Sequence, residues 1–255
     1  MINNIELEEI INNKLKSHSI NDPYSINGLQ VEGKKKISKI VTGVTICQKL
    51  IDYAIELNAD AIIVHHGLLK PKNDLKVIGL MSNRLRSLLT NNINLYAWHI
   101  PLDIHLELGN NTQFAKSLNI NIIGNLNNLI MYGNFNKIIT SNELYLILSN
   151  KLHCDIIHYN YNNNLINELA WCTGSGHNYI ELVARSGINC FVTGNISENT
   201  IYYSQEYKMN FYAANHDNTE VGGIYALSNW LKNKNLDVTF INLSTKNNKN
   251  LFNKF

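Results

Sequence analysis

The sequence predicts an α/β protein made of two related halves, each with a mainly parallel sheet covered by helices. Three observations indicate this class. Between residues 38 and 99, short β-rich runs alternate with segments of helical apolar spacing. A similar order of strand, Thr-Gly pair, helix and buried strand returns over residues 168–195. A strand, a helix and a final strand follow over residues 210–243.

The first half opens with an amphipathic helix and continues as alternating strands and helices. Residues 1–18 carry apolar side chains at helical spacing, and we expect these to face inward: Ile5, Leu7, Ile10, Ile11 and Leu15. The expected elements that follow are a strand at 38–44, a helix at 48–58, a buried strand at 59–67, a helix at 77–92 and a strand at 93–99. This alternation favours a parallel sheet with both faces covered.

The two halves are expected to meet near residue 126. An irregular, asparagine-rich stretch over 120–167 separates the repeated units, which gives halves at 1–126 and 127–255 that can be interleaved. In the match between the units, Thr193 and Gly194 take the place of His65 and His66. The first half therefore carries an imidazole pair that the second half lacks.

Composition bounds the partners and the compartment. The chain of 255 residues has 45% hydrophobic and 16% charged residues, as in an ordinary globular protein. Its net charge of +2 makes nucleic acid or an anionic membrane an unlikely partner. No apolar run approaches the roughly 20 residues of a membrane span, and the acidic N-terminal segment does not resemble a secretory signal. We therefore expect a cytoplasmic protein without membrane contact. The four cysteines form no CxxC pair, so neither a disulfide framework nor a thiolate zinc site is indicated.

Candidate metal ligands follow three expected strands at their carboxyl ends. In open parallel sheets, ligands bind in the crevice beyond those ends. Imidazole and carboxylate donors together suit Zn, Mn, Fe, Co or Ni, and the absence of thiolate disfavours a structural zinc site. The six candidates are His65 and His66 after the first strand, His99 and Asp103 after the second, and His216 and Glu220 after the third.

Spacing within these pairs supports the metal interpretation, although each residue also has an ordinary explanation. His216 and Glu220 meet on one face if residues 217–223 open a helix. His99 and Asp103 have the same spacing, but Pro101 disfavours a regular helix there, so a tight loop would have to bring them together. In the ordinary explanation, Asp103 caps the helix that follows it, and Glu220 is a first-turn residue that the helix dipole stabilises. A single histidine at a strand end would then be a hydrogen-bonded structural residue. The adjacent histidine pair is the feature that these alternatives explain least well.

Several segments of the sequence closely resemble one known family. They are "DPYSINGLQVEG" (22–33), "ADAIIVHHG" (59–67), residues 83–111, "FVTGNISENT" (191–200) and residues 216–231. The order HHG, H-x-P-L-D, H-x-x-T-E is similar to that of the Nif-three-like, or YbgI-like, dinuclear-metal family. Members are often labelled GTP cyclohydrolase I type 2 homologues.

The resemblance implies two divalent metal ions per subunit, in a cleft at the strand ends. His65 and His66 would take one ion each, Asp103 would hold one and His216 the other. Glu220 would bridge both ions and His99 would lie beside or on them, so these two are also the candidate catalytic residues. The family forms ring-shaped hexamers, which implies a homo-oligomer here.

Two positions depart from the family pattern. Asn215 stands where a glycine usually precedes the last histidine, and asparagine tolerates positive φ better than most residues. Asn195 stands where the pattern has a glutamate, which removes a carboxylate near the implied cleft. This second departure puts any acid or base role at that position in doubt.

The predicted function is a dinuclear-metal-dependent hydrolase of a nucleotide-like or other small substrate. Two neighbouring divalent ions activate water and clamp an electrophilic centre, and opening of the guanine ring of GTP is one version of such a reaction. One alternative is a metal-binding or metal-trafficking protein without turnover. A second alternative is a nucleic-acid phosphodiesterase, which the small net charge disfavours.

Overall fold

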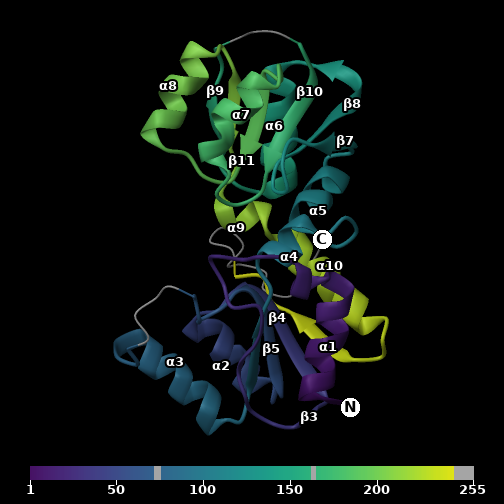
Figure 1. The fold of residues 1–255 in the computed structure, drawn as a ribbon, viewed down its shortest axis with the longest axis vertical. Helices are drawn as coiled ribbons and strands as arrows, with labels where there is room; N and C mark the ends of the chain where they lie inside the picture. The colour runs from purple at the N-terminus through teal and green to yellow at the C-terminus, as the bar shows by residue number, and fades with distance from the viewer. Residues whose placement is uncertain (72–75, 162–164, 244–255) are drawn as a thin grey trace. The chain divides into compact units, whose positions relative to one another are not determined.

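The computed structural model describes residues 1–71, 76–161 and 165–243. The chain forms two compact units, Met1–Leu108 with Ile224–Phe255 as unit 1 and Gly109–Gly223 as unit 2. Each unit contains a sheet with helices, so the expected α/β class is confirmed (Figure 1). The units are interleaved along the chain and do not coincide with halves divided at residue 126.

Unit 1 is built on a five-stranded sheet in the order β13-β4-β5-β6-β2. Neighbouring strands from β13 to β6 are parallel, and only β2 pairs antiparallel, against β6. Its elements are β1 (Ile2–Asn3), α1 (Asn4–Leu15), β2 (Gly28–Val31), β3 (Lys36–Ile37), β4 (Lys39–Thr45), α2 (Gln48–Glu56), β5 (Ala61–His66), α3 (Gly79–Thr90), β6 (Asn94–Ala97), α4 (Ile100–Ile104), α10 (Val221–Lys232) and β13 (Asp237–Phe240). A separate ribbon pairs β1 with β3. The parallel strands agree with the sequence prediction.

Both faces of this sheet are buried, which explains the unbroken apolar run in β5. Ile62 and Val64 pack with residues of α2, whereas Ile63 belongs to a core shared with α1 and α10. Because successive side chains of a strand point to opposite faces, both sets must be apolar when helices cover both sides. In Figure 1, α2 and α1 flank β4 and β5 accordingly.

Helix α1 shows the expected amphipathic packing except at its first turn. Asn3 caps the helix by accepting a 2.9 Å hydrogen bond from the Ile5 N–H. Leu7, Ile11 and Leu15 are buried, but Ile5 is 48% exposed, so the expectation that it faces inward is wrong. The buried positions recur every four residues, and Ile5 lies two residues before the first of them, on the opposite side of the helix.

Unit 2 has a six-stranded sheet in the order β7-β8-β10-β11-β12-β9. Its elements are α5 (Asn110–Ser117), β7 (Asn121–Asn125), β8 (Met131–Ile139), α6 (Ser141–Leu152), β9 (Ile157–Tyr159), β10 (Ile166–Cys172), α7 (Ile180–Arg185), β11 (Cys190–Thr193), α8 (Glu198–Glu206), β12 (Asn210–Ala213) and α9 (His216–Thr219). Strands β10, β11 and β12 are parallel, and antiparallel β9 pairs with β12. Unit 1 repeats this scheme with β4, β5, β6 and antiparallel β2, in line with the similarity found between the two sequence segments.

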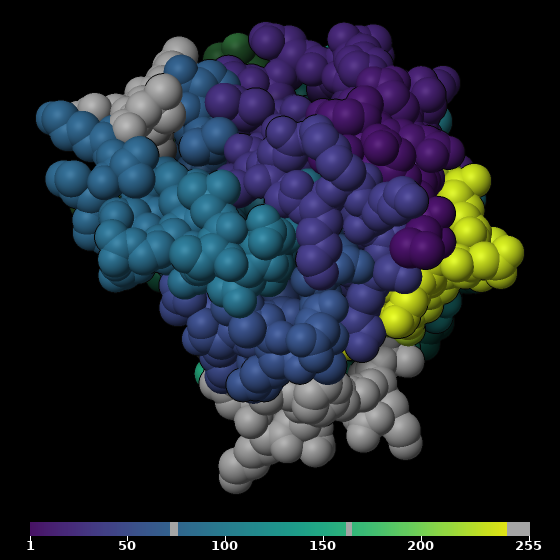
Figure 2. Space-filling view, turned by 90° about the horizontal axis from the view of Figure 1, so that it is seen from below, coloured from purple at the N-terminus to yellow at the C-terminus, as the bar shows by residue number. Residues whose placement is uncertain are grey.

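The last described helix from Ile224 onward and the last described strand belong to unit 1. Ile224, Leu227 and Leu231 of α10 lie in the same core as Leu7 and Ile11 of α1. Strand β13 then pairs in parallel with β4. Figure 2 shows the yellow C-terminal residues beside the purple N-terminal ones on this unit. This return explains why the unit boundary differs from residue 126. Within the described ranges, no helix combines the length and apolar character that crossing a membrane requires.

Candidate metal centre

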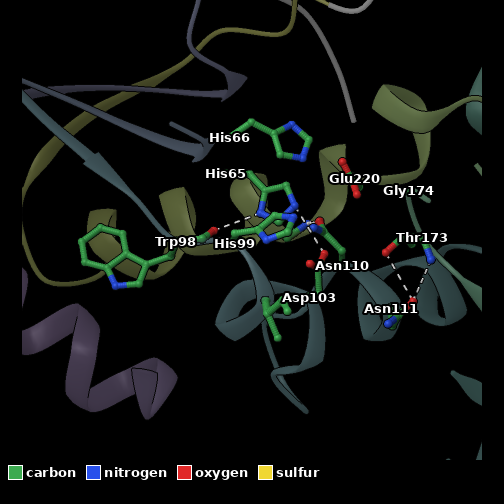
Figure 3. Close-up of polar contacts among 12 residues, drawn as sticks. His65, His66, Trp98, His99, Asp103, Asn110, Asn111, Thr173, Gly174 and Glu220 are labelled. Atoms are coloured by element: carbon green, nitrogen blue, oxygen red, sulfur yellow. Dashed lines mark hydrogen bonds and ion pairs between the residues drawn. The ribbon is translucent and has the colours of Figure 1, made fainter. Parts of the chain in front are cut away.

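Three histidines gather where two neighbouring parallel strands of unit 1 end. His65 and His66 close β5, and His99 follows β6 by two residues. Val64 pairs with Ala97, so both strands reach the same edge of the sheet. The ring centroids of His65 lie 4.4 Å from His66 and 5.0 Å from His99, and the ring nitrogens offered by the three lie within 4.8 Å of one another (Figure 3). Sequence reasoning predicted these three residues as neighbours.

Each of the three rings is held through Nδ1. His65 Nδ1 lies 2.9 Å from the Trp98 carbonyl oxygen, which can only accept, so this nitrogen carries the proton (Figure 3). His66 Nδ1 lies 2.9 Å from the Thr45 hydroxyl, and His99 Nδ1 lies 3.2 Å from an Asp22 carboxylate oxygen. Metal-ligating histidines are oriented in this way, with one ring nitrogen bound to protein and the other turned to the ion.

Helix α4 brings a carboxylate to the same cluster. It begins directly after His99 and contains Pro101, so the expectation that this proline opposes a helix is wrong. The proline lies in the first turn, where a missing N–H costs no helical hydrogen bond. The Asp103 N–H donates to the His99 carbonyl at 3.1 Å, and Asp103 Oδ1 lies 3.4 Å from His65 Nε2. Asp103 therefore belongs to the cluster and does not cap the following helix, whose N-cap is Gly109.

Asp22 was not among the candidate residues, yet it contacts the cluster directly. Burial raises the pKa of its carboxyl, but the hydrogen bond and charge of His99, together with the Tyr24 and Ile100 N–H groups, lower that pKa to about 2. The side chain is 2% exposed. An aspartate before a proline in the "DPYS" turn indicates a side chain that binds its own backbone. No sequence pattern indicates its pairing with a histidine that lies 77 positions later.

Gln30 supports the loop that follows the histidine pair. Its Oε1 accepts the N–H groups of Leu68 and Leu69 at 2.8 Å and 3.0 Å. The glycine of the HHG segment is required at this point, because a Cβ on Gly67 would lie 2.6 Å from the Ala97 Cβ. The segment over 22–33, which carries part of the family resemblance, thus supports both strand ends.

In unit 2, the last histidine and its glutamate form a pair as predicted. They lie at either end of the turn made by α9, with His216 Nε2 3.1 Å from Glu220 Oε2. Glu220 is 3% exposed. Asn215 precedes the pair with φ of 65°, so this asparagine adopts the backbone conformation that the usual glycine would favour. Asn215 thus holds a positive φ, and its side chain caps α9 by accepting a hydrogen bond from the Asn218 N–H.

A tight turn after β10 packs against this pair. Gly174 has φ of 65°. A Cβ at this position would overlap Glu220 Oε1 and would lie 2.9 Å from Glu220 Cδ and 3.2 Å from His216 Nε2. The Gly174 N–H donates to the Thr219 hydroxyl at 3.0 Å. Asn195 joins the same turn, because its N–H donates to the Gly174 carbonyl at 3.1 Å and its amide lies 3.4 Å from the Ser175 hydroxyl. The amide contributes no charge here, unlike the glutamate of the family pattern.

The donor set fits a divalent transition metal. Within unit 1 three imidazoles lie beside the Asp103 carboxylate, and within unit 2, described separately, one imidazole pairs with the Glu220 carboxylate. Nitrogen and oxygen donors of these types suit Zn, Mn, Fe, Co and Ni. No cysteine is required, and three of the four are buried as free thiols. These features define a mixed α/β protein with a candidate metal centre of histidines and carboxylates.

Comparison with known proteins identifies the family. The Duf34/NIF3 (NGG1p interacting factor 3) family profile matches residues 2–249, and the chain belongs to this family. A relative from Escherichia coli strain K12, named GTP cyclohydrolase 1 type 2 homolog, is 46% identical over 242 residues, which cover 94% of this chain and 98% of the relative. A relative of the same name from Buchnera aphidicola subsp. Baizongia pistaciae is 45% identical over 246 residues, 95% of this chain and 98% of the relative.

Solved structures share the fold. The structure described as protein ybgI of unknown function has a TM-score of 0.94 and 45% identity, and covers 96% of this chain and 99% of its own. Reduced HcgD from Methanocaldococcus jannaschii has a TM-score of 0.83 and 26% identity, and covers 95% of this chain and 98% of its own. The expected resemblance is therefore confirmed.

Proposed function

We propose that this chain is a dinuclear-metal-dependent hydrolase that acts on a nucleotide-like or other small substrate. The observation that carries the proposal is the convergence of His65, His66 and His99 at one sheet edge, each with Nδ1 held by another group. Relatives named GTP cyclohydrolase 1 type 2 homolog support a guanine nucleotide as the first substrate class to test.

In this proposal the ligands divide between the two ions according to the family pattern. His65 and His66 would each hold an ion, and Asp103, His216 and Glu220 would supply the remaining donors. His99 completes the set as a further ligand nitrogen. When bound, paired divalent ions supply Lewis acidity and an activated water.

Hydrogen bonds within the protein orient the ring of His65 for this chemistry. The Trp98 carbonyl keeps the proton of His65 on Nδ1, so Nε2 carries the lone pair that a cation needs. Asp103 and Glu220 are 8% and 3% exposed, and two nearly buried carboxylates supply the negative charge that divalent cations require.

We also propose that the active form is a homo-oligomer, a ring-shaped hexamer as the family resemblance implies. Light scattering coupled to size-exclusion chromatography measures the mass directly. A measured mass close to six times the 29.0 kDa of one chain would support the hexameric ring, and the mass of a single chain would contradict it.

The deciding experiment measures metal content and turnover on the same preparation. We expect about two divalent ions per chain by elemental analysis, and metal-dependent turnover within a panel of GTP, other nucleotides and small phosphodiesters. His65→Ala and Glu220→Gln should lose both ions and turnover while remaining folded. Two matched controls, His18→Ala and Glu198→Gln, remove an exposed histidine and an exposed glutamate. These control variants should keep their bound ions and their turnover.

Two outcomes contradict the proposal in different ways. If the protein holds no metal after purification and reloading, these residues do not form a metal centre. Two firmly bound ions without turnover on any substrate of the panel would instead indicate a metal carrier.

A further inference from the structure

A loop near the start of the chain closes around His99 from two directions. Asn27 Oδ1 accepts the backbone N–H of His99 at 2.8 Å, and the Asp22 carboxylate contacts the imidazole Nδ1 at 3.2 Å and 3.3 Å. The ring of Tyr24 packs edge-on against the same imidazole, with centroids 6.0 Å apart. This loop contributes none of the predicted metal ligands, so its contacts with His99 need a separate explanation.

The Asp22 carboxylate is fixed independently of the histidine. Four other donors reach it, at 2.9 Å to 3.1 Å: the N–H groups of Tyr24, Ser25 and Ile100, and the side-chain amide of Asn27. With only 2% of its side chain exposed, it has no room to follow a moving ring. The carboxylate therefore sets the position of the imidazole.

We infer that Asp22 is a positioning residue that keeps the His99 proton on Nδ1 and turns Nε2 toward His65 and His66. A carboxylate oxygen accepts and cannot donate, so this contact selects the Nδ1–H tautomer. Neutral His99 then offers its lone pair from Nε2, on the side of the ring opposite Asp22. The role in metal binding rests on the proposed function, whereas the tautomer does not.

The tautomer is measured first, in metal-free protein at a pH where His99 is neutral. Protein labelled with ¹⁵N only at histidine gives the ring nitrogen shifts, and His99→Gln assigns the signals. We expect a protonated Nδ1 and an unprotonated Nε2 in the unsubstituted protein. The opposite tautomer, or an average of the two, overturns the inference without any variant having to fold.

The second measurement tests whether Asp22 acts through His99. We expect Asp22→Asn to weaken Co²⁺ binding about 10–100-fold, the usual loss when a partner of a ligating histidine is removed. The matched control is Asp60→Asn, because Asp60 is another nearly buried carboxylate of unit 1 that accepts two backbone N–H groups, and it should leave Co²⁺ binding unchanged.

A double-mutant cycle separates positioning from general support of the fold. Once His99→Gln has removed the ring, adding Asp22→Asn should weaken Co²⁺ binding no further. Full additivity of the two losses would show that Asp22 acts without His99 and would overturn the inference. If the unsubstituted protein binds no Co²⁺, the proposed function fails, and the tautomer measurement still decides the role of Asp22.

Discussion

Replacement of Gly174 by alanine tests whether the position of Glu220 matters for metal binding. Ordinary carbon–carbon contacts lie at about 3.5–4.0 Å, whereas the new Cβ would lie 2.9 Å from Glu220 Cδ, so the carboxylate must recede by about 0.6–1.1 Å. Metal–ligand distances tolerate about 0.2 Å. We therefore expect Gly174→Ala to weaken Co²⁺ binding at least tenfold, since the loss should match that of a removed ligand partner.

The backbone effect of this substitution has a matched control. Gly187 also has a positive φ, 85°, but a Cβ there would meet no atom within 4 Å. An L-residue in this region costs about 1–2 kcal/mol, which lowers Tm by about 2–8 °C in a chain of this size. Both alanine variants should show this loss by thermal unfolding, but only Gly174→Ala should also lose Co²⁺. Equal Co²⁺ affinity in the two variants would refute the assignment of Glu220 as a positioned ligand.

Three further predictions concern stability. Burial lowers the pKa of His105, whose Nε2–H donates to the Lys14 carbonyl at 2.9 Å; the unfolded chain therefore binds more protons, and the free energy of unfolding should fall as pH drops below about 6.5. His105→Gln should reduce this slope in urea unfolding curves recorded across that range, and an unchanged slope would contradict the assignment. Although burial raises the pKa of Asp60, the Lys34 contact and two backbone N–H groups lower it overall. Asp60 therefore contributes to the free energy of unfolding above its ordinary pKa, and this contribution is lost as pH falls through the lowered pKa of the folded state. Asp60→Asn should lower the free energy of unfolding by about 1.5–3 kcal/mol at neutral pH and should remove the part of it that depends on acidic pH. Urea unfolding at neutral and acidic pH measures both effects. Finally, chelation of metal held at 100 times its Kd should lower the free energy of unfolding by about 2.7 kcal/mol, and a Tm unaffected by chelator would contradict tight binding to the native state.

Periodicity predicted the parallel sheets because it reports local burial. The run that ends in His65 is apolar at every position, as a strand covered on both faces must be, and β5 is such a strand. The same reasoning placed the histidines at the ends of β5 and β6. It could not predict that α10 returns to unit 1, because that packing joins residues more than 200 positions apart.

Two local expectations failed for identifiable physical reasons. The expectation that Pro101 disfavours a regular helix is wrong, because a proline in the first turn of α4 removes no hydrogen bond. Ile5 is apolar yet exposed, because it lies opposite the buried stripe of α1. The sequence does not predict the role of Asp22, because the contact that reveals it is with a distant histidine. The neighbouring residues of Asp22 are explained equally well by an ordinary turn, in which its carboxylate accepts the Tyr24 N–H.

The interleaving of the two units has a consequence for synthesis on the ribosome. The core of unit 2 consists of residues between 114 and 214, whereas the core of unit 1 needs Ile224, Leu227 and Leu231. A nascent chain can therefore complete the inserted unit while the sheet that carries the histidine pair still lacks one of its covering helices. Because domains fold as units during translation, the imidazole cluster acquires its final support only once residues 224–231 have emerged.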